Sequence, residues 1–156
     1  MNEIIFRAAT MSDISELVKL RFMAILETDG VDQNQRTPEF EKTVHDYFKE
    51  CLSNQTYFGA VAELDGRLIS NNGLILYKKP PAFKGTTGIV GYVTNVYTMP
   101  EFRNRGIASE LMKLLITFAK NSGATKIHLG TTDDGRKLYE KHGFKDLAIP
   151  GLELRF

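Results

Sequence analysis

The sequence has little cysteine, no long apolar run and almost no net charge, and each absence excludes a class of protein. Cys51 is the single cysteine, so the chain has neither a disulfide framework nor a thiolate zinc site, and a reducing, cytoplasmic setting is expected. The first residues, MNEIIFRAATMSD, lack a basic head followed by a long apolar stretch, and no run approaches the roughly 18 apolar residues of a membrane span. We therefore expect neither export nor a membrane partner.

The balance of charge argues against a nucleic-acid partner. Lys and Arg number 20 and Asp and Glu number 19, a net charge of +1, whereas nucleic-acid-binding surfaces carry a marked basic excess. Any bound anion is then small and held locally. The length of 156 residues and the 42% hydrophobic content are ordinary for one globular domain. We expect a single domain over residues 1–156.

Hydrophobic periodicity and turn signals predict a mixed α/β fold. Thr10 and Asp13 match a capping-box signature, and Thr37-Pro38 is a cap followed by a proline in the first helical turn. Asp65-Gly66 favours a type I′ hairpin, because that turn needs positive φ at both positions. The predicted strands span 3–7, 57–64, 67–77, 89–98, 125–130 and 152–156, and the predicted helices begin at about 14, 38, 107 and 134. The order is β-α-α-β-β-β-α-β-α-β, with three consecutive antiparallel strands.

The stretch MPEFRNRGIASELMKLLITFAK, residues 99–120, places positive charge and a glycine directly before a clear amphipathic helix. A helix start has four backbone N–H groups without partners and partial positive charge, so it is a ready anion site. Gly106 allows the backbone to approach a ligand closely. Arg103 and Arg105 add charge, and the Ser109 hydroxyl can donate a further hydrogen bond. These features suit a pyrophosphate, and the alternative is a tight turn with solvated arginines.

Two motifs resemble those of a known family. The chain lacks both G-x-x-x-x-G-K-[ST] and G-x-G-x-x-G, which disfavours an ATPase or a nicotinamide enzyme. Residues 103–108, RNRGIA, follow the strand NVYTMP and resemble the [QR]-x-x-G-x-[GA] motif of the GNAT superfamily of acetyl-CoA-dependent N-acetyltransferases; LYEKHGF, residues 138–144, is similar to a later motif of that family. The resemblance implies a mixed, mostly antiparallel central sheet flanked by helices.

The resemblance also implies where acetyl-CoA, as co-substrate, is held. The pyrophosphate is expected on the backbone amides of residues 104–109, and the pantetheine arm is expected to pair with the preceding strand as an added β partner. The family commonly has asparagine seven residues before the tyrosine of the later motif, where this chain has Thr132, whose hydroxyl can replace one amide contact. The expected cofactor-binding residues are Val96, Tyr97, Thr98, Arg103, Asn104, Arg105, Gly106, Ile107, Ala108, Ser109 and Thr132.

Transfer of the acetyl group needs an acid, a base and a site for the developing oxyanion. Tyr139 corresponds to the family's tyrosine, and its phenol, a group whose pKa is ordinarily near 10, can protonate the leaving sulfur at neutral pH; a packing role in the core is the alternative. A backbone N–H near Tyr97 or Thr98 can hold the oxyanion. The candidates for the base are Glu63, Asp46 and a water held by Tyr92 or Asn95. The three histidines show no metal-ligand spacing, and no metal is expected.

The acceptor is constrained only by charge. In the family, residues corresponding to 27–36 and 148–153 flank the acceptor pocket, and here Glu27, Asp29 and Asp32 favour a cationic amine, with a solvated acidic loop as the alternative. Protein lysines and N-termini, and a longer acyl donor, stay open. The rival hypothesis is a non-catalytic acyl-CoA-binding or sensing module. The alternating segment LELRF can pair between subunits, so a homodimer is a further expectation.

Overall fold

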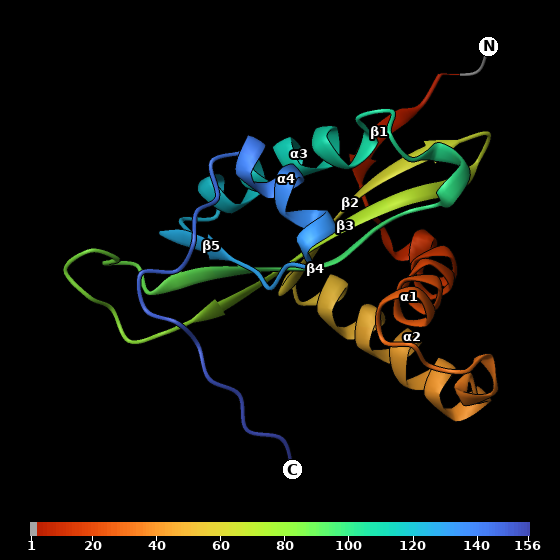
Figure 1. The fold of residues 1–156 in the computed structure, drawn as a ribbon, viewed down its shortest axis with the longest axis horizontal. Coiled ribbons are helices and arrows are strands. Elements are labelled where there is room, and N and C mark those ends of the chain that lie inside the picture. The colour runs from red at the N-terminus through yellow and green to blue at the C-terminus, as the bar shows by residue number, and fades with distance from the viewer. Residues whose placement is uncertain (1–2) are drawn as a thin grey trace.

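The structure is a computed structural model that describes residues 3–156. Its order of elements agrees with the predicted order except at the C-terminus (Figure 1). The elements are β1 (Ile5–Ala8), η1 (Met11–Asp13), α1 (Ile14–Thr28), η2 (Gln33–Gln35), α2 (Pro38–Ser53), β2 (Tyr57–Leu64), β3 (Arg67–Lys78), β4 (Ile89–Thr98), η3 (Pro100–Phe102), α3 (Ile107–Asn121), β5 (Lys126–His128) and α4 (Asp133–Lys141), where η marks a short 3₁₀ turn.

The strands form one sheet in the order β1-β2-β3-β4-β5, in which each of the first four is antiparallel to its neighbour and β5 is parallel to β4. The β2–β3 turn has φ of 53° at Asp65 and 76° at Gly66, which confirms the predicted hairpin. A register shift between β3 and β4 places two residues of β4, Asn95 and Val96, opposite Asn72 alone. This β-bulge lies in the middle of the sheet, beside the candidate site.

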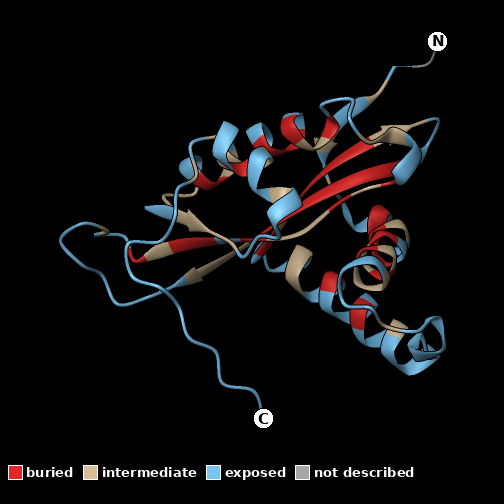
Figure 2. Cartoon of the chain, in the orientation of Figure 1, coloured by how far each residue is buried: buried red, intermediate tan, exposed pale blue. Residues whose placement is uncertain are grey.

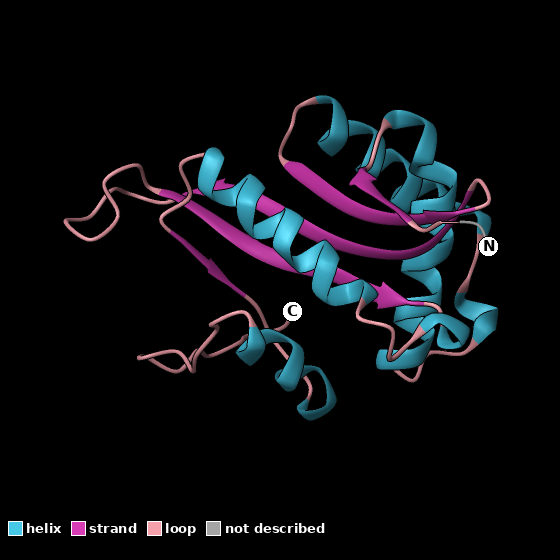
Figure 3. Ribbon diagram, turned by 90° about the horizontal axis from the view of Figure 1, so that it is seen from above, coloured by secondary structure: helices cyan, strands magenta, loops and turns pink. Residues whose placement is uncertain are grey.

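Helices cover both faces of the sheet (Figures 1 and 3). On one face, α1 and α2 bury Leu17 and Phe48, and the Phe48 ring meets Tyr57 of β2 edge to face at 5.3 Å. On the other face, α3 buries Met112 and Leu115 against the centre of the sheet. The buried residues therefore run along the central strands between two helical layers (Figure 2).

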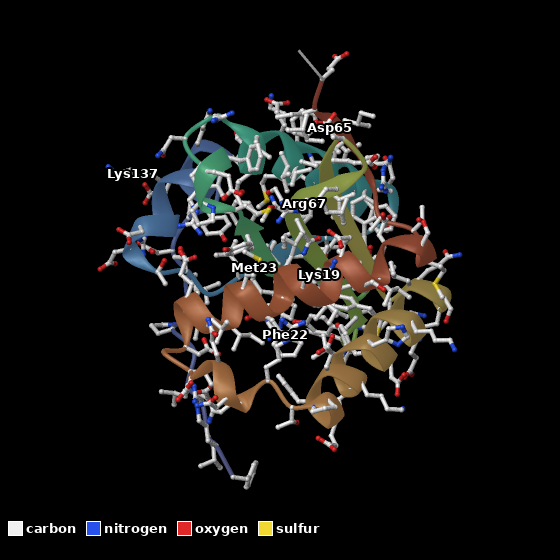
Figure 4. All side chains as sticks on the ribbon, turned by 90° about the vertical axis from the view of Figure 1, so that its right-hand side faces the viewer. Lys19, Phe22, Met23, Asp65, Arg67 and Lys137 are labelled. Carbon is white, nitrogen blue, oxygen red and sulfur yellow. The ribbon has the colours of Figure 1, made fainter. Side chains whose placement is uncertain are left out.

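The helix starts follow the predicted caps. The backbone N–H of Thr10 donates to Asp13 Oδ2 at 2.7 Å, and the amide of Phe40 donates to Thr37 Oγ1 at 3.2 Å. The hydrogen bond from Arg7 holds the pKa of Asp13 below its ordinary value. On α1, Phe22 points to the side opposite Met23 (Figure 4), and its ring packs against Phe40 at the start of α2.

The predicted final strand is wrong. Residues 142–156 form neither helix nor strand, and the apolar side chains of LELRF are fully or largely exposed, from 78% at Leu154 to 116% at Phe156. Alternation gives a segment one apolar face, but a strand also needs a hydrogen-bonded neighbour. Here the segment leads away from the sheet (Figure 1), and the nearest edge strand, β5, is only three residues long. Within residues 3–156 no helix combines the length and the apolar character that crossing a membrane requires.

Candidate active site

The start of α3 has an unusual backbone that aims amide groups outward. Gly106 is the N-cap with φ of 76°, and Asn104 has φ of 60°, so a residue with left-handed backbone lies on each side of Arg105 in the loop. The first hydrogen bond of the helix runs from the Glu110 amide to the Gly106 carbonyl at 3.1 Å. Within the described chain, the amides of Ile107 and Ala108 donate to no backbone carbonyl outside the helix. Such a row of N–H groups forms a concave anion-binding nest.

The sequence explained Gly106 by close approach of a ligand, and the structure adds a second reason. A Cβ built at Gly106 meets nothing within 4 Å, so the space around it is open. The left-handed φ is what favours glycine here, because an L side chain rarely adopts it. The amide direction at the start of α3 therefore depends on this residue.

A cavity of about 400 Å³ opens in front of the α3 start. Nine of the eleven expected cofactor-binding residues line it, and the exceptions are Arg105 and Thr132. It is bordered by the end of α1 and by the first turn of α4. The lining residues that belong to the expected set are Val96, Tyr97, Thr98, Arg103, Asn104, Gly106, Ile107, Ala108 and Ser109.

The two arginines are engaged by the protein itself. The Arg103 side chain donates to the Thr98 carbonyl at 2.8 Å and to Glu27 Oε2 at 2.6 Å, and it lies over the Tyr97 ring. The Glu27 hydrogen bond raises the pKa of Arg103 above its ordinary value. Arg105 donates to the Glu101 carbonyl at 3.0 Å and lies over a phenylalanine ring. Arg103 thus borders the cavity with part of its charge neutralised, and Arg105 does not line it.

Strand β4 has an open edge beside this cavity. β5 pairs with β4 only from Val90 to Tyr92, so the residues of β4 beyond Tyr92 have no β5 partner on that side. The Tyr97 carbonyl accepts from Ser70 Oγ at 2.9 Å and the Thr98 carbonyl accepts from Arg103. The Met99 amide donates to the Ile69 carbonyl of β3, and Tyr97, two residues earlier, lies opposite Asn71, so the Tyr97 backbone faces β3 and the expected backbone contact from Tyr97 is not available at the open edge. An added strand would therefore meet chiefly the backbone of Val96 and the amide of Thr98.

A second cavity, of about 440 Å³, continues the first toward the middle of the sheet. The two share the lining residues Thr28, Val96, Gly135 and Leu138, so they are adjoining parts of one cleft. Tyr139 lines the second part, as do two further residues singled out in the sequence, Tyr92 and Asn95. Thr132 also lines it, and its hydroxyl accepts from the Gly135 amide at 3.3 Å as the N-cap of α4.

Tyr139 is held deep in the wall of this cleft. Its residue exposure is 9%, its ring packs edge to face on Phe144 at 5.8 Å, and its hydroxyl has no hydrogen-bond partner among residues 3–156. Burial, and to a lesser extent Tyr92, raises the pKa of Tyr139 above its ordinary value. The phenol therefore keeps its proton at neutral pH and is free to donate it to a group in the cleft.

The candidate bases separate into two groups. Glu63 is bound by Arg7 at 2.6 Å, Asp46 pairs with Lys42 on the exposed face of α2, and neither lines the cleft. Tyr92 and Asn95 both line it. Of the candidates, only the two residues expected to hold a water, Tyr92 or Asn95, therefore lie in the cleft.

Several contacts within the site join residues far apart in the sequence. Ser109, in the first turn of α3, shares a 2.9 Å hydrogen bond with His142 Nε2 at the end of α4, so the helix that carries Tyr139 is tied to the helix start. Asn71 and Asn72 of β3 reach the β4 bulge and the first turn of α3. Sequence reasoning missed these contacts, and the one signal for them is a pair of adjacent asparagines inside an apolar strand.

Comparison with known proteins identifies the family. The model of the acetyltransferase (GNAT) family matches residues 21–144, and the chain belongs to this family. Thialysine N-epsilon-acetyltransferase of Mus musculus is 27% identical over 143 residues, which cover 90% of this chain and 74% of the mouse protein. The crystal structure of a predicted acetyltransferase from Clostridium acetobutylicum with acetyl-CoA is 33% identical, covers 98% of this chain and 96% of its own, and has a TM-score of 0.87.

A more distant structure shows the fold alone. Glucosamine-6-phosphate N-acetyltransferase of Arabidopsis thaliana is 18% identical, with a TM-score of 0.74 over 97% of this chain and 98% of its own. The mixed sheet flanked by helices is therefore the GNAT fold, as the sequence predicted.

Proposed function

We propose that this chain is an N-acetyltransferase that moves an acetyl group from acetyl-CoA to a primary amine by direct attack in a ternary complex. One observation carries the proposal: the outward amides of the α3 start and the open edge of β4 line one cleft, which leads to the buried phenol of Tyr139. Family membership and the acetyl-CoA in the Clostridium acetobutylicum structure support acetyl-CoA as co-substrate.

The residues present fit that co-substrate. The amides of residues 104–109 would hold the diphosphate, the backbone of Val96 and the amide of Thr98 would pair with the pantetheine arm, and Thr132 lies further along the same wall. Tyr97 lines the same cavity. The proton that Tyr139 keeps at neutral pH is available for the leaving thiolate. Asn95, where the bulge breaks the ladder, marks the part of β4 whose amides can face a developing oxyanion.

The acceptor proposed here is a small cationic amine. Of the three acidic residues singled out in the sequence, Glu27 is engaged by Arg103 and Asp32 caps a short turn by accepting from the Asn34 amide, whereas Asp29 lines the cavity that contains Tyr139. A carboxylate at that place attracts an ammonium group. The name of the mouse relative specifies an ε-amino group, which supports the same class of acceptor.

The test is a thiol-release screen with acetyl-CoA over polyamines, lysine analogues, aminoglycosides and peptide N-termini, together with calorimetry of coenzyme A. Thiol release above background with at least one small cationic amine is expected. Binding of coenzyme A without release for any amine would favour the non-catalytic acyl-CoA-binding module. No heat with coenzyme A would contradict both hypotheses. Faster thiol release from succinyl-CoA than from acetyl-CoA would show that the enzyme prefers a longer acyl donor.

A further inference from the structure

Asn71 and Asn72 are consecutive residues of the central strand β3, and both are buried, with exposures of 2% and 0%. Successive side chains of a strand point to opposite faces of the sheet. Asn72 accordingly reaches α3 on one face, and Asn71 reaches Tyr57 and the β4 bulge on the face that α1 and α2 cover. One dipeptide therefore contacts both structures that form the cleft.

The Asn72 contact fixes the start of α3. Its Nδ2 donates to the carbonyl of Ala108 at 2.9 Å, in the first turn of the helix. The amides of Ile107 and Ala108 belong to the same turn, and both residues line the cleft. A change in the position of the Ala108 carbonyl therefore redirects the nest of N–H groups.

The Asn71 contact fixes the bulge. Its Nδ2 donates at 2.9 Å to the carbonyl of Asn95, which has the left-handed φ of 52°. The Tyr57 hydroxyl contacts both Asn71 and Asn95, at 3.5 Å from Asn71 Nδ2 and 3.4 Å from Asn95 Nδ2. This cluster holds β4 in the irregular course that opens its edge toward the cleft.

Stability alone does not account for two asparagines at this place. Burying an amide is costly unless its groups are paired, and an apolar side chain of similar size would fill the same space. The Oδ1 atoms of Asn71 and Asn72 are buried without a hydrogen-bond partner in the described structure. What each amide does provide is one directed bond to a main-chain carbonyl of the cleft.

We infer that Asn71 and Asn72 are positioning residues, and that each one independently sets one of the two backbone elements of the donor site. Asn72 orients the α3 amides toward the diphosphate, and Asn71 orients the β4 bulge toward the thioester. This inference rests on the proposed function. It requires that the Asn71→Ala and Asn72→Ala enzymes differ in how much kcat/KM falls with a donor that lacks the diphosphate.

The experiment compares acetyl-CoA with acetyl-pantetheine, which keeps the thioester and lacks the diphosphate, using an amine found in the screen. For Asn72→Ala we expect kcat/KM to fall by roughly five- to tenfold with acetyl-CoA, the value of one hydrogen bond, and to change little with acetyl-pantetheine. For Asn71→Ala we expect a similar fall with both donors. The ratio between donors is unaffected by the fraction of enzyme that is folded, since that fraction cancels.

Leu74→Ala is the matched control, because Leu74 lies on the same strand and face as Asn72, is fully buried and makes no polar contact with the helix start. We expect it to lower the melting temperature and to leave the donor ratio unchanged. An Asn72→Ala donor ratio equal to that of the wild type, or equal to that of Leu74→Ala, would overturn the inference.

A second measurement needs no acceptor amine. Calorimetry with coenzyme A should show a roughly five- to tenfold weaker Kd for Asn72→Ala and a smaller change for Asn71→Ala. Equal weakening in both variants would contradict independent positioning. Wild-type protein that gives no heat would instead contradict the proposed function, so the two failures are distinguishable.

Discussion

The two halves of the cleft are built differently. The donor half is fixed by main-chain features, namely left-handed residues at Asn104 and Gly106 and the bulge at Asn95, with buried side chains behind them. The acceptor half is expected beside residues 27–36 and 148–153, which are exposed apart from the partly buried Val31; of these residues, Glu27, Thr28 and Asp29 line the described cleft. The donor half therefore depends on backbone geometry, and the expected acceptor half on exposed side chains.

This difference indicates how one fold can serve several amines. A donor common to a family can be held by main-chain groups that do not vary with side-chain identity. The names of two of the proteins compared above specify different acceptors, thialysine and glucosamine 6-phosphate. Exposed connections can change their side chains without disturbing the core, and they are the natural place for such variation.

The largest effect is expected at Tyr139, the residue proposed to protonate the leaving thiolate. We expect Tyr139→Phe to lower kcat by on the order of 10²-fold or more, the usual contribution of a general acid, while the Kd of coenzyme A stays within about twofold. Thiol-release kinetics and calorimetry measure the two quantities. Since the pKa of Tyr139 is raised, wild-type activity should lose no contribution from this group as the pH falls from 8 to 6.

Tyr47→Phe is the control for that substitution, because Tyr47 lies on α2 and lines neither part of the cleft. It should keep the wild-type kcat. A Tyr139→Phe enzyme with an unchanged kcat and a raised KM would show that the phenol binds substrate and transfers no proton.

A smaller effect is expected from the backbone of the donor half. Gly106 and Gly66 both have φ of 76°, and at neither does a Cβ meet an atom within 4 Å. Alanine should therefore destabilise the fold by about 1 kcal/mol at either position. Only Gly106→Ala should also weaken coenzyme A binding, by on the order of tenfold, because only that loop aims amides at the cleft. Thermal melting and calorimetry separate the two effects. Equal Kd values in both variants would contradict a main-chain phosphate site.

The same contrast explains which features of the fold and the site could be predicted from the sequence and which could not. Local signals set the helix caps, the Asp65-Gly66 turn, the bounds of β4 and the start of α3, and all of these are confirmed. The α3 loop could be located because its chemistry needs contiguous residues. Ser109 with His142 could not be paired, since 33 residues separate them and only the folded chain joins them. The strand predicted for LELRF is wrong because alternation is a local property of the sequence, whereas a strand also needs a pairing partner that local sequence does not specify.

A modest effect is expected at the ion pair that joins the end of α1 to the loop before α3. Glu27 accepts from Arg103, so Glu27→Gln should free the guanidinium for the diphosphate and strengthen coenzyme A binding by roughly two- to fivefold at low ionic strength. The gain should largely disappear near 0.5 M salt, because exposed charges are screened. Glu41→Gln, which breaks the comparably exposed pair with Arg36, is the control and should leave the Kd unchanged. Weaker binding by Glu27→Gln would show that Glu27 holds Arg103 in its productive place.

The smallest effect is expected from the exposed C-terminal segment, which includes part of the expected acceptor half. Leu152 and Leu154 are 104% and 78% exposed, so replacing both with serine should change the free energy of unfolding by less than about 0.5 kcal/mol and leave the Kd of coenzyme A unchanged. By contrast, Leu74→Ala removes a fully buried side chain and should cost about 2–5 kcal/mol. Denaturant unfolding measures both. A loss in the double variant that approaches that of Leu74→Ala would mean that this segment packs on the sheet in solution. The acceptor half would then be built as firmly as the donor half, and its specificity would have to be sought in a paired strand.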